Sequence, residues 1–166
     1  MPENRKVMQK IFMFFFLICS SQSFGQSTKS QDTLISISYS SFGMVSNFKM
    51  EIDSIRIVYN ELSQQSGKKK KFIADMERYN WKEIIRLIAA IDLPKLGSLQ
   101  SPTNHRGVDG AYYAAITIRT SGGSYQSMDF DEGLPMKEIK DLLALIDRMI
   151  NRVLVVPDYT RYVKEN

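Results

Sequence analysis

The residue types best suited to chemistry lie in the segment Gly97–Gly110, which holds the only histidine of the chain, His105. Ser101, His105 and Asp109 are the types that serve as nucleophile, general base and orienting carboxylate. Their spacing in one loop does not establish contact between them, and the chain has no Gly-x-Ser-x-Gly turn to present a serine. The segment therefore indicates a ligand or partner surface (His105, Arg106, Asp109) or a structural loop that Arg106 and Asp109 tie down.

A second group of candidate residues is acidic. Asp129, Asp131 and Glu132 offer the oxygen ligands that a hard cation such as calcium prefers. An EF-hand-like loop would continue with Asp or Asn and then Gly, whereas the chain continues with Gly133 and Leu134. We therefore expect an acidic strand end before a helix, with no metal and no cofactor.

Lys68, Lys69, Lys70 and Lys71 form the sharpest charge feature of the sequence. Consecutive lysines attract anionic lipid headgroups, lipopolysaccharide or acidic glycans. They are equally typical of a solvated loop that discourages strands from pairing edge to edge. Tyr112, Tyr113 and Trp81 could form a platform for sugars, although a tryptophan at a helix start is more typical of a core.

Alternating apolar residues predict the first strands, over 34–39, 48–53 and 55–59. A tight hairpin at Asp53-Ser54 would keep its apolar residues on one face. It would pair Ile52 with Ile55, Met50 with Ile57 and Phe48 with Tyr59. The polar stretch 62–71 indicates a loop, and 72–74 is either a short strand or the approach to a helix.

Two amphipathic helices follow, separated by a second hairpin. Asn80 and Glu83 have the spacing of a capping box at the start of the first helix, and Pro94 is expected to end it. A three-residue loop, Gly122–Ser124, would join strands 111–120 and 125–130. It would pair Ile118 with Met128 and Ile116 with Phe130. Pro135 suits the first turn of the last helix, whose buried stripe is Ile139, Leu142, Leu143, Ile146 and Ile150.

This order of elements predicts an α+β fold, a two-layer sandwich in which two helices cover an antiparallel sheet of about five strands. The order is β-β-β-α-β-β-α, a meander followed by a hairpin. We expect one domain over residues 34–153 and a C-terminal tail, 154–166, that docks on it.

The N-terminus carries the pattern of a secretory signal peptide. Arg5, Lys6 and Lys10 precede the apolar run 11–18, and small residues follow, which predicts cleavage before Gln26. Residues 1–25 would be the leader and 26–33 a flexible mature N-terminus. The apolar run is too short to span a bilayer, so we expect no transmembrane helix in the mature chain.

Three alternatives for this leader stay open. The chain could be lipid-anchored at Cys19, it could keep an uncleaved N-terminal anchor, or translation could start at Met8. Cys19 is the only cysteine, so a mature chain from Gln26 has no thiol chemistry and no disulfide.

Cleavage also lowers the positive charge. It takes Lys+Arg from 22 to 19 and Asp+Glu from 18 to 17, and the net charge from +4 to +2. The basic balance is thus partly a property of the leader and does not indicate nucleic acid.

The features from Ile35 to Met149 resemble a family of uncharacterised small exported bacterial α+β proteins. The resemblance rests on the leader, the Phe48–Asp53 strand with its short turn, and a helix after Gly133-Leu134-Pro135. Many members have a cysteine-bracketed first turn, which this chain lacks. The resemblance implies export, to the periplasm or beyond the cell, and implies no activity.

We therefore expect an exported, non-catalytic binding or assembly module of the bacterial cell envelope. Its partner would be an envelope protein, a glycan or an anionic surface. The alternative is a small hydrolase or lyase that acts on an envelope polymer through His105.

Overall fold

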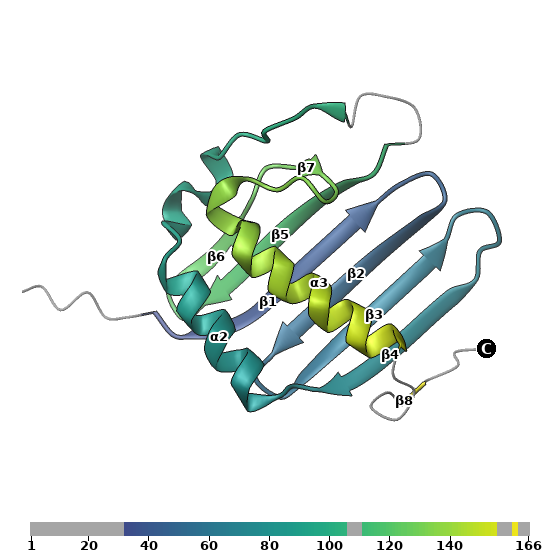
Figure 1. Ribbon diagram of the computed structural model, residues 1–166, viewed down its shortest axis with the longest axis horizontal. Helices are drawn as coiled ribbons and strands as arrows, with labels where there is room; N and C mark the ends of the chain where they lie inside the picture. Colours follow the sequence, from purple (N-terminus) through teal and green to yellow (C-terminus); the bar gives the residue numbers. More distant parts are fainter. Residues whose placement is uncertain (1–31, 106–110, 156–160, 163–166) are drawn as a thin grey trace, which may run out of the picture. The chain divides into compact units, whose positions relative to one another are not determined.

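The computed structural model describes residues 32–105, 111–155 and 161–162, which form one antiparallel sheet with helices against one face (Figure 1). The strand order is β6-β5-β1-β2-β3-β4-β8, and β7 pairs with β5. The strands are β1 (Leu34–Phe42), β2 (Ser46–Asp53), β3 (Arg56–Ser63), β4 (Lys69–Asp75), β5 (Tyr113–Thr120), β6 (Gly123–Gln126), β7 (Phe130–Asp131) and β8 (Arg161–Tyr162). The helices are α2 (Arg78–Ala89) and α3 (Lys140–Val155), with 3-10 turns η1 (Leu93–Ser98) and η3 (Lys137–Ile139).

The layered α+β architecture is confirmed, but the predicted number and order of strands are wrong. Only 64–68 of the predicted loop 62–71 is a turn, because β3 runs to Ser63 and β4, which includes 72–74, begins at Lys69. The second hairpin does not follow β4 in the sheet, since β5 pairs with β1. Lysine is depleted in strands yet suits an edge, so composition hid a strand near the edge of this sheet.

One face of the sheet holds the core, because side chains alternate between the two faces of a strand. Ile37, Met50, Ile52 and Ile57 point toward the helices and are at most 5% exposed. Helix residues complete this layer, and each fully buried aliphatic side chain contributes about 1.5–3 kcal/mol. The helix residues buried in the core are Ile84, Ile88, Leu142, Leu143, Leu145, Ile146 and Met149.

The first hairpin differs from its predicted register by two residues. Ile52 lies opposite Ile57, and Met50 opposite Tyr59. The Asp53 carboxylate accepts hydrogen bonds from the backbone N–H groups of Ile55 and Arg56, at 2.7 and 2.9 Å, an Asx turn that places Ile55 in the loop. A shift of two keeps the side chains within the paired strands on their predicted faces, whereas Ile55 leaves the apolar face.

The predicted register of the second hairpin is also wrong. Thr120 lies opposite Gly123 and Ile118 opposite Tyr125, so the loop has two residues. Beyond Tyr125 the returning strand contains one extra residue, and Phe130 pairs with Ala114. Met128 lies between these two pairings and is 55% exposed, so it does not lie opposite Ile118 in the core as predicted.

The two helices begin differently from the prediction, since α3 begins at Lys140, after the turn η3, and Pro135 precedes both. Helix α2 starts at Arg78 after Glu77, and Asn80 does not cap it but donates its side-chain amide to the Glu77 carboxylate at 3.2 Å. It ends at Ala89, before Pro94, which instead lies in the first turn of η1. The α3 residue Arg152 forms an ion pair with Glu77 at 2.9 Å, which joins the two helices.

Candidate functional site

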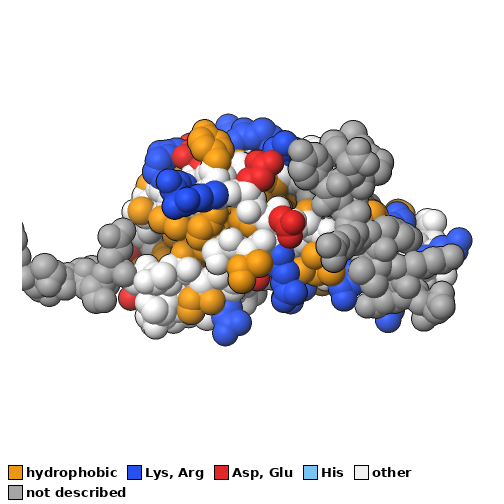
Figure 2. Space-filling model, turned by 90° about the horizontal axis from the view of Figure 1, so that it is seen from below, with side chains coloured by type: hydrophobic (Ala, Val, Ile, Leu, Met, Phe, Trp, Pro, Cys, Tyr) orange, Lys and Arg blue, Asp and Glu red, His pale blue; other side chains and the backbone are white. Residues whose placement is uncertain are grey.

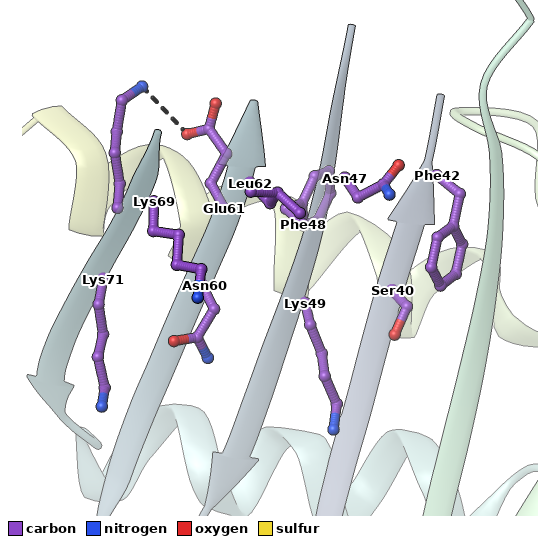
Figure 3. Close-up of a pocket in the computed structure, with 11 residues that line it drawn as sticks. Ser40, Phe42, Asn47, Phe48, Lys49, Asn60, Glu61, Leu62, Lys69 and Lys71 are labelled. Atoms are coloured by element: carbon purple, nitrogen blue, oxygen red, sulfur yellow. Dashed lines mark hydrogen bonds and ion pairs between the residues drawn. The ribbon is translucent and has the colours of Figure 1, made fainter. Parts of the chain in front are cut away.

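The face of the sheet opposite α2 and α3, which we call the open face, carries no helix among the described residues (Figure 1). Pairing across β1–β4 sets Ser40 opposite Lys49, Lys49 opposite Asn60, and Asn60 opposite Lys71. Figure 3 shows the side chains of Lys49, Asn60 and Lys71 projecting from the same side of neighbouring strands. Adjacent strands lie about 4.8 Å apart, so one polar row with two lysines crosses four strands.

A second row, two residues nearer the turns, is more apolar. Phe42 lies opposite Asn47, Asn47 opposite Leu62, and Leu62 opposite Lys69. Phe42 also lies opposite Tyr113 of β5, with their rings stacked at 5.4 Å between centroids. Aromatic and aliphatic groups thus stand beside the polar row.

The two rows line an open groove of about 310 Å³. Glu61 also borders the groove, but its side chain lies on the helix side of the sheet, where it forms an ion pair with Lys70 at 3.2 Å. Lys49 forms a 2.7 Å ion pair with Glu51 on the same face, and both side chains remain half exposed. The other groove lysines are Lys69 and Lys71, so the groove combines positive charge with amide and apolar groups.

The predicted lysine surface is therefore divided by the sheet. Lys69 and Lys71 point to the open face, whereas Lys70 points to the helix side toward Glu61. Lys68 precedes β4 and is exposed. The alternation of side chains along β4, rather than the run of four lysines, decides which lysines share a face.

On the side drawn in Figure 2, basic, acidic and hydrophobic side chains are interspersed rather than separated into one charged patch.

The predicted loop surface is organised by a residue outside that loop. The backbone N–H of His105 donates to the carboxylate of Asp131 at 2.7 Å, and the Thr103 hydroxyl donates to the same oxygen. The His105 side chain is exposed. Arg106 and Asp109 lie outside the described residues. Within the described residues, the Asp131 carboxylate holds this loop through its hydrogen bonds to Thr103 and His105.

The acidic residues do not act as one group. Asp129 is exposed, Asp131 is 4% exposed, and Glu132 is half-buried. Among the described residues no three His, Cys, Asp or Glu side chains come together as a metal ion would require.

Trp81, on α2, packs against the core and lies on the opposite side of the sheet from Tyr113. The two side chains therefore do not form one platform for sugars.

The surroundings of Glu132 raise the pKa of its carboxyl group. Burial raises its pKa, and the charge of Asp147 on α3 raises it further. The Ser41 hydroxyl, fully buried and outside good hydrogen-bond geometry, lowers it only in part. Burial and the charge of Glu132 also raise the pKa of Tyr39. At pH values below the pKa that Glu132 has in the unfolded chain, its carboxyl group is protonated in both the folded and the unfolded state. The cost of burying its negative charge therefore lowers stability only at higher pH.

We expect Glu132→Gln to stabilise the protein at pH 7, because burial and the charge of Asp147 make the ionised carboxylate less favourable in the native state than in the unfolded state. Native stability should fall as pH rises from the usual range of glutamate, about 4.3, through the raised pKa. Thermal unfolding should show a melting temperature a few degrees higher for the variant at pH 7 and none of this gain near pH 4. An equal gain at both values would contradict a charge effect.

Sequence patterns alone did not identify the groove. Lys49, Asn60, Phe42 and Leu62 come from three strands, and only the register brings them together. The clue that the sequence offered was the alternation within each strand, which marks the side chains that point away from the core.

Among the described residues, no helix combines the length and apolar character needed to cross a bilayer.

Comparison of the chain with protein-family models, with curated proteins and with solved structures finds no match in any of the three.

Proposed function

We propose that the protein is an exported, non-catalytic binding module of the cell envelope that holds an anionic ligand on its open face. The observation that carries this proposal is the groove of about 310 Å³ lined by Lys49, Lys69 and Lys71. The signal-peptide pattern of residues 1–25 supports the envelope location. Charged ligand groups form the strongest hydrogen bonds with such side chains.

The groove also combines amide, apolar and positively charged groups, as binding sites commonly do, whereas a surface that only keeps a protein in solution needs no apolar groups. Asn47 and Asn60 offer both donors and acceptors, and Phe42 and Leu62 offer apolar area beside the lysines. A ligand with anionic groups on a partly apolar or ring-containing body matches this arrangement. Glycans, lipid headgroups and acidic peptides of the envelope share this chemistry.

The test is a titration of the isotope-labelled full chain with three soluble anions, followed by amide chemical shifts. The probes are a sulfated tetrasaccharide, glycerol phosphate and dihexanoyl phosphatidylglycerol. We expect shifts that cluster on the groove strands β1–β4. Lys69→Gln with Lys71→Gln should weaken binding roughly tenfold or more, because a charge-assisted hydrogen bond contributes about 1.5–3 kcal/mol and ~1.4 kcal/mol is a factor of ten.

The matched control is Lys82→Gln with Lys140→Gln, which removes the same charge from exposed positions on α2 and α3. It should bind like the native chain. Shifts spread over both faces, equal weakening in the two double variants, or no binding of any probe would each overturn the proposal.

A further inference from the structure

Exposed apolar side chains gather at one end of the sheet, where β1 turns into β2, β3 turns into β4 and β5 begins (Figure 1). This turn end consists of Phe42, Met44, Val45, Leu62 and Tyr113, which are between 36% and 61% exposed. The backbone N–H of Gln64 donates to the carbonyl of Val45 at 2.8 Å, which joins the two turns. A contiguous exposed apolar patch is typical of a docking surface.

The turn that carries Met44 and Val45 is braced. The backbone N–H of Gly43 donates to the Asn47 side chain at 3.1 Å. The ring of Tyr112 lies so close against Gly43 that a Cβ there would collide with it. Met44 and Val45 are therefore held out in solvent by packed neighbours.

Lysines border these apolar side chains. Lys69 lies opposite Leu62 in the sheet, Lys71 follows on the same face, and Lys68 is exposed beside the β3–β4 turn. Apolar side chains that can enter the acyl boundary, bordered by lysines at headgroup level, suit an anionic lipid surface. Tyrosine, with an apolar ring and a polar tip, suits the same interface.

We propose that the turn end docks on the surface of an anionic membrane. Met44 and Val45 enter the boundary between headgroups and acyl chains, and Lys68, Lys69 and Lys71 meet the headgroups. This inference rests on the proposed function, because it assigns the groove lysines to lipid headgroups. A soluble acidic glycan would satisfy the lysines but leave Met44 and Val45 without a role.

The experiment uses the full chain with a fluorophore at one position, because residues 11–18 are apolar and could bind vesicles by themselves. A nitrobenzoxadiazole label on Met44→Cys, in a Cys19→Ser background, reports the environment of the turn end. The control label is on Tyr79→Cys, since Tyr79 is 75% exposed on α2. The vesicles contain either phosphatidylglycerol or phosphatidylcholine.

We expect the emission at position 44 to shift to the blue and to rise severalfold with phosphatidylglycerol vesicles only. The label at position 79 should not respond. Adding Lys69→Gln and Lys71→Gln should raise the lipid concentration at half-maximal response roughly 10- to 30-fold, since each lysine near such a surface contributes about 1 kcal/mol.

An unchanged emission at position 44, or an equal change at position 79, would overturn the membrane proposal even if the chain sediments with vesicles. The proposed function would survive that result if soluble anions still shift the groove amides. Binding of the tetrasaccharide with no response at position 44 would assign the groove to a soluble acidic glycan.

Discussion

Replacement of Phe130 by alanine should lower the free energy of unfolding by about 3–5 kcal/mol, the usual cost of emptying a large buried aromatic site. Phe130, in β7, is 0% exposed and pairs with Ala114 of β5. It closes the core beside β5 just before the chain enters α3. Since small domains have only about 5–15 kcal/mol of stability, this one change should remove a large part of it.

Urea denaturation followed by circular dichroism measures this loss as a lower midpoint at an unchanged slope. Met128→Ala is the matched control, because Met128 lies two residues earlier and is 55% exposed. It should stay within about 0.5 kcal/mol of the native chain. If Phe130→Ala does not fold, Phe130→Leu should fold with a smaller loss. Equal effects of the alanine variants at 128 and 130 would contradict the observed burial of Phe130 and exposure of Met128.

The next largest effect is expected at Asp131. Asp131→Ala should cost about 2–3 kcal/mol, because hydrogen bonds to a charged acceptor contribute more than neutral ones. The variant leaves the His105 N–H and the Thr103 hydroxyl without the carboxylate that both use. The segment before His105 should therefore become more susceptible to limited proteolysis, in addition to the lower midpoint in urea.

Asp129→Ala is the control for Asp131, since it removes the same charge from an exposed position two residues away. It should change stability by less than about 0.5 kcal/mol. A small effect at Asp131, or similar effects at both positions, would show that other contacts hold the loop. The pair of variants thus separates a buried structural carboxylate from a general acidic surface.

Sequence patterns predicted the faces of this fold better than its connections. Alternation assigned Ile37, Met50 and Ile57 to the core, and that assignment survives the two-residue shift of the first hairpin because side chains repeat every two residues. The shift itself came from the Asp53 side chain, whose hydrogen bonds outweighed apolar pairing. The strand β4 was predicted only as one of two alternatives and only over 72–74, because its first three residues are lysine.

The candidate site was predictable only in part. Lys69 and Lys71 were identified as part of a charged run, but their partners on the open face depend on strand order, a long-range property that local patterns do not contain. The loop that contains His105 was selected for its residue types, whereas the contact that holds it is a hydrogen bond to the Asp131 carboxylate of β7. A buried carboxylate and an exposed one look alike in a sequence, and Asp131 beside Asp129 shows the difference.

The position of β1 between β2 and β5 bears on how the chain reaches this structure. β1 is the first strand within the described residues, and one of its two neighbours lies far along the sequence, with Ile37 opposite Ile118. Such distant pairing makes loop closure costly and slows folding. A chain that emerges N-terminus first would present β1 early with only β2 available as a partner. Until β5 follows, the other edge of β1 is open to strands of other molecules, so the centre of the finished sheet is the part most exposed to misassembly while the chain is incomplete.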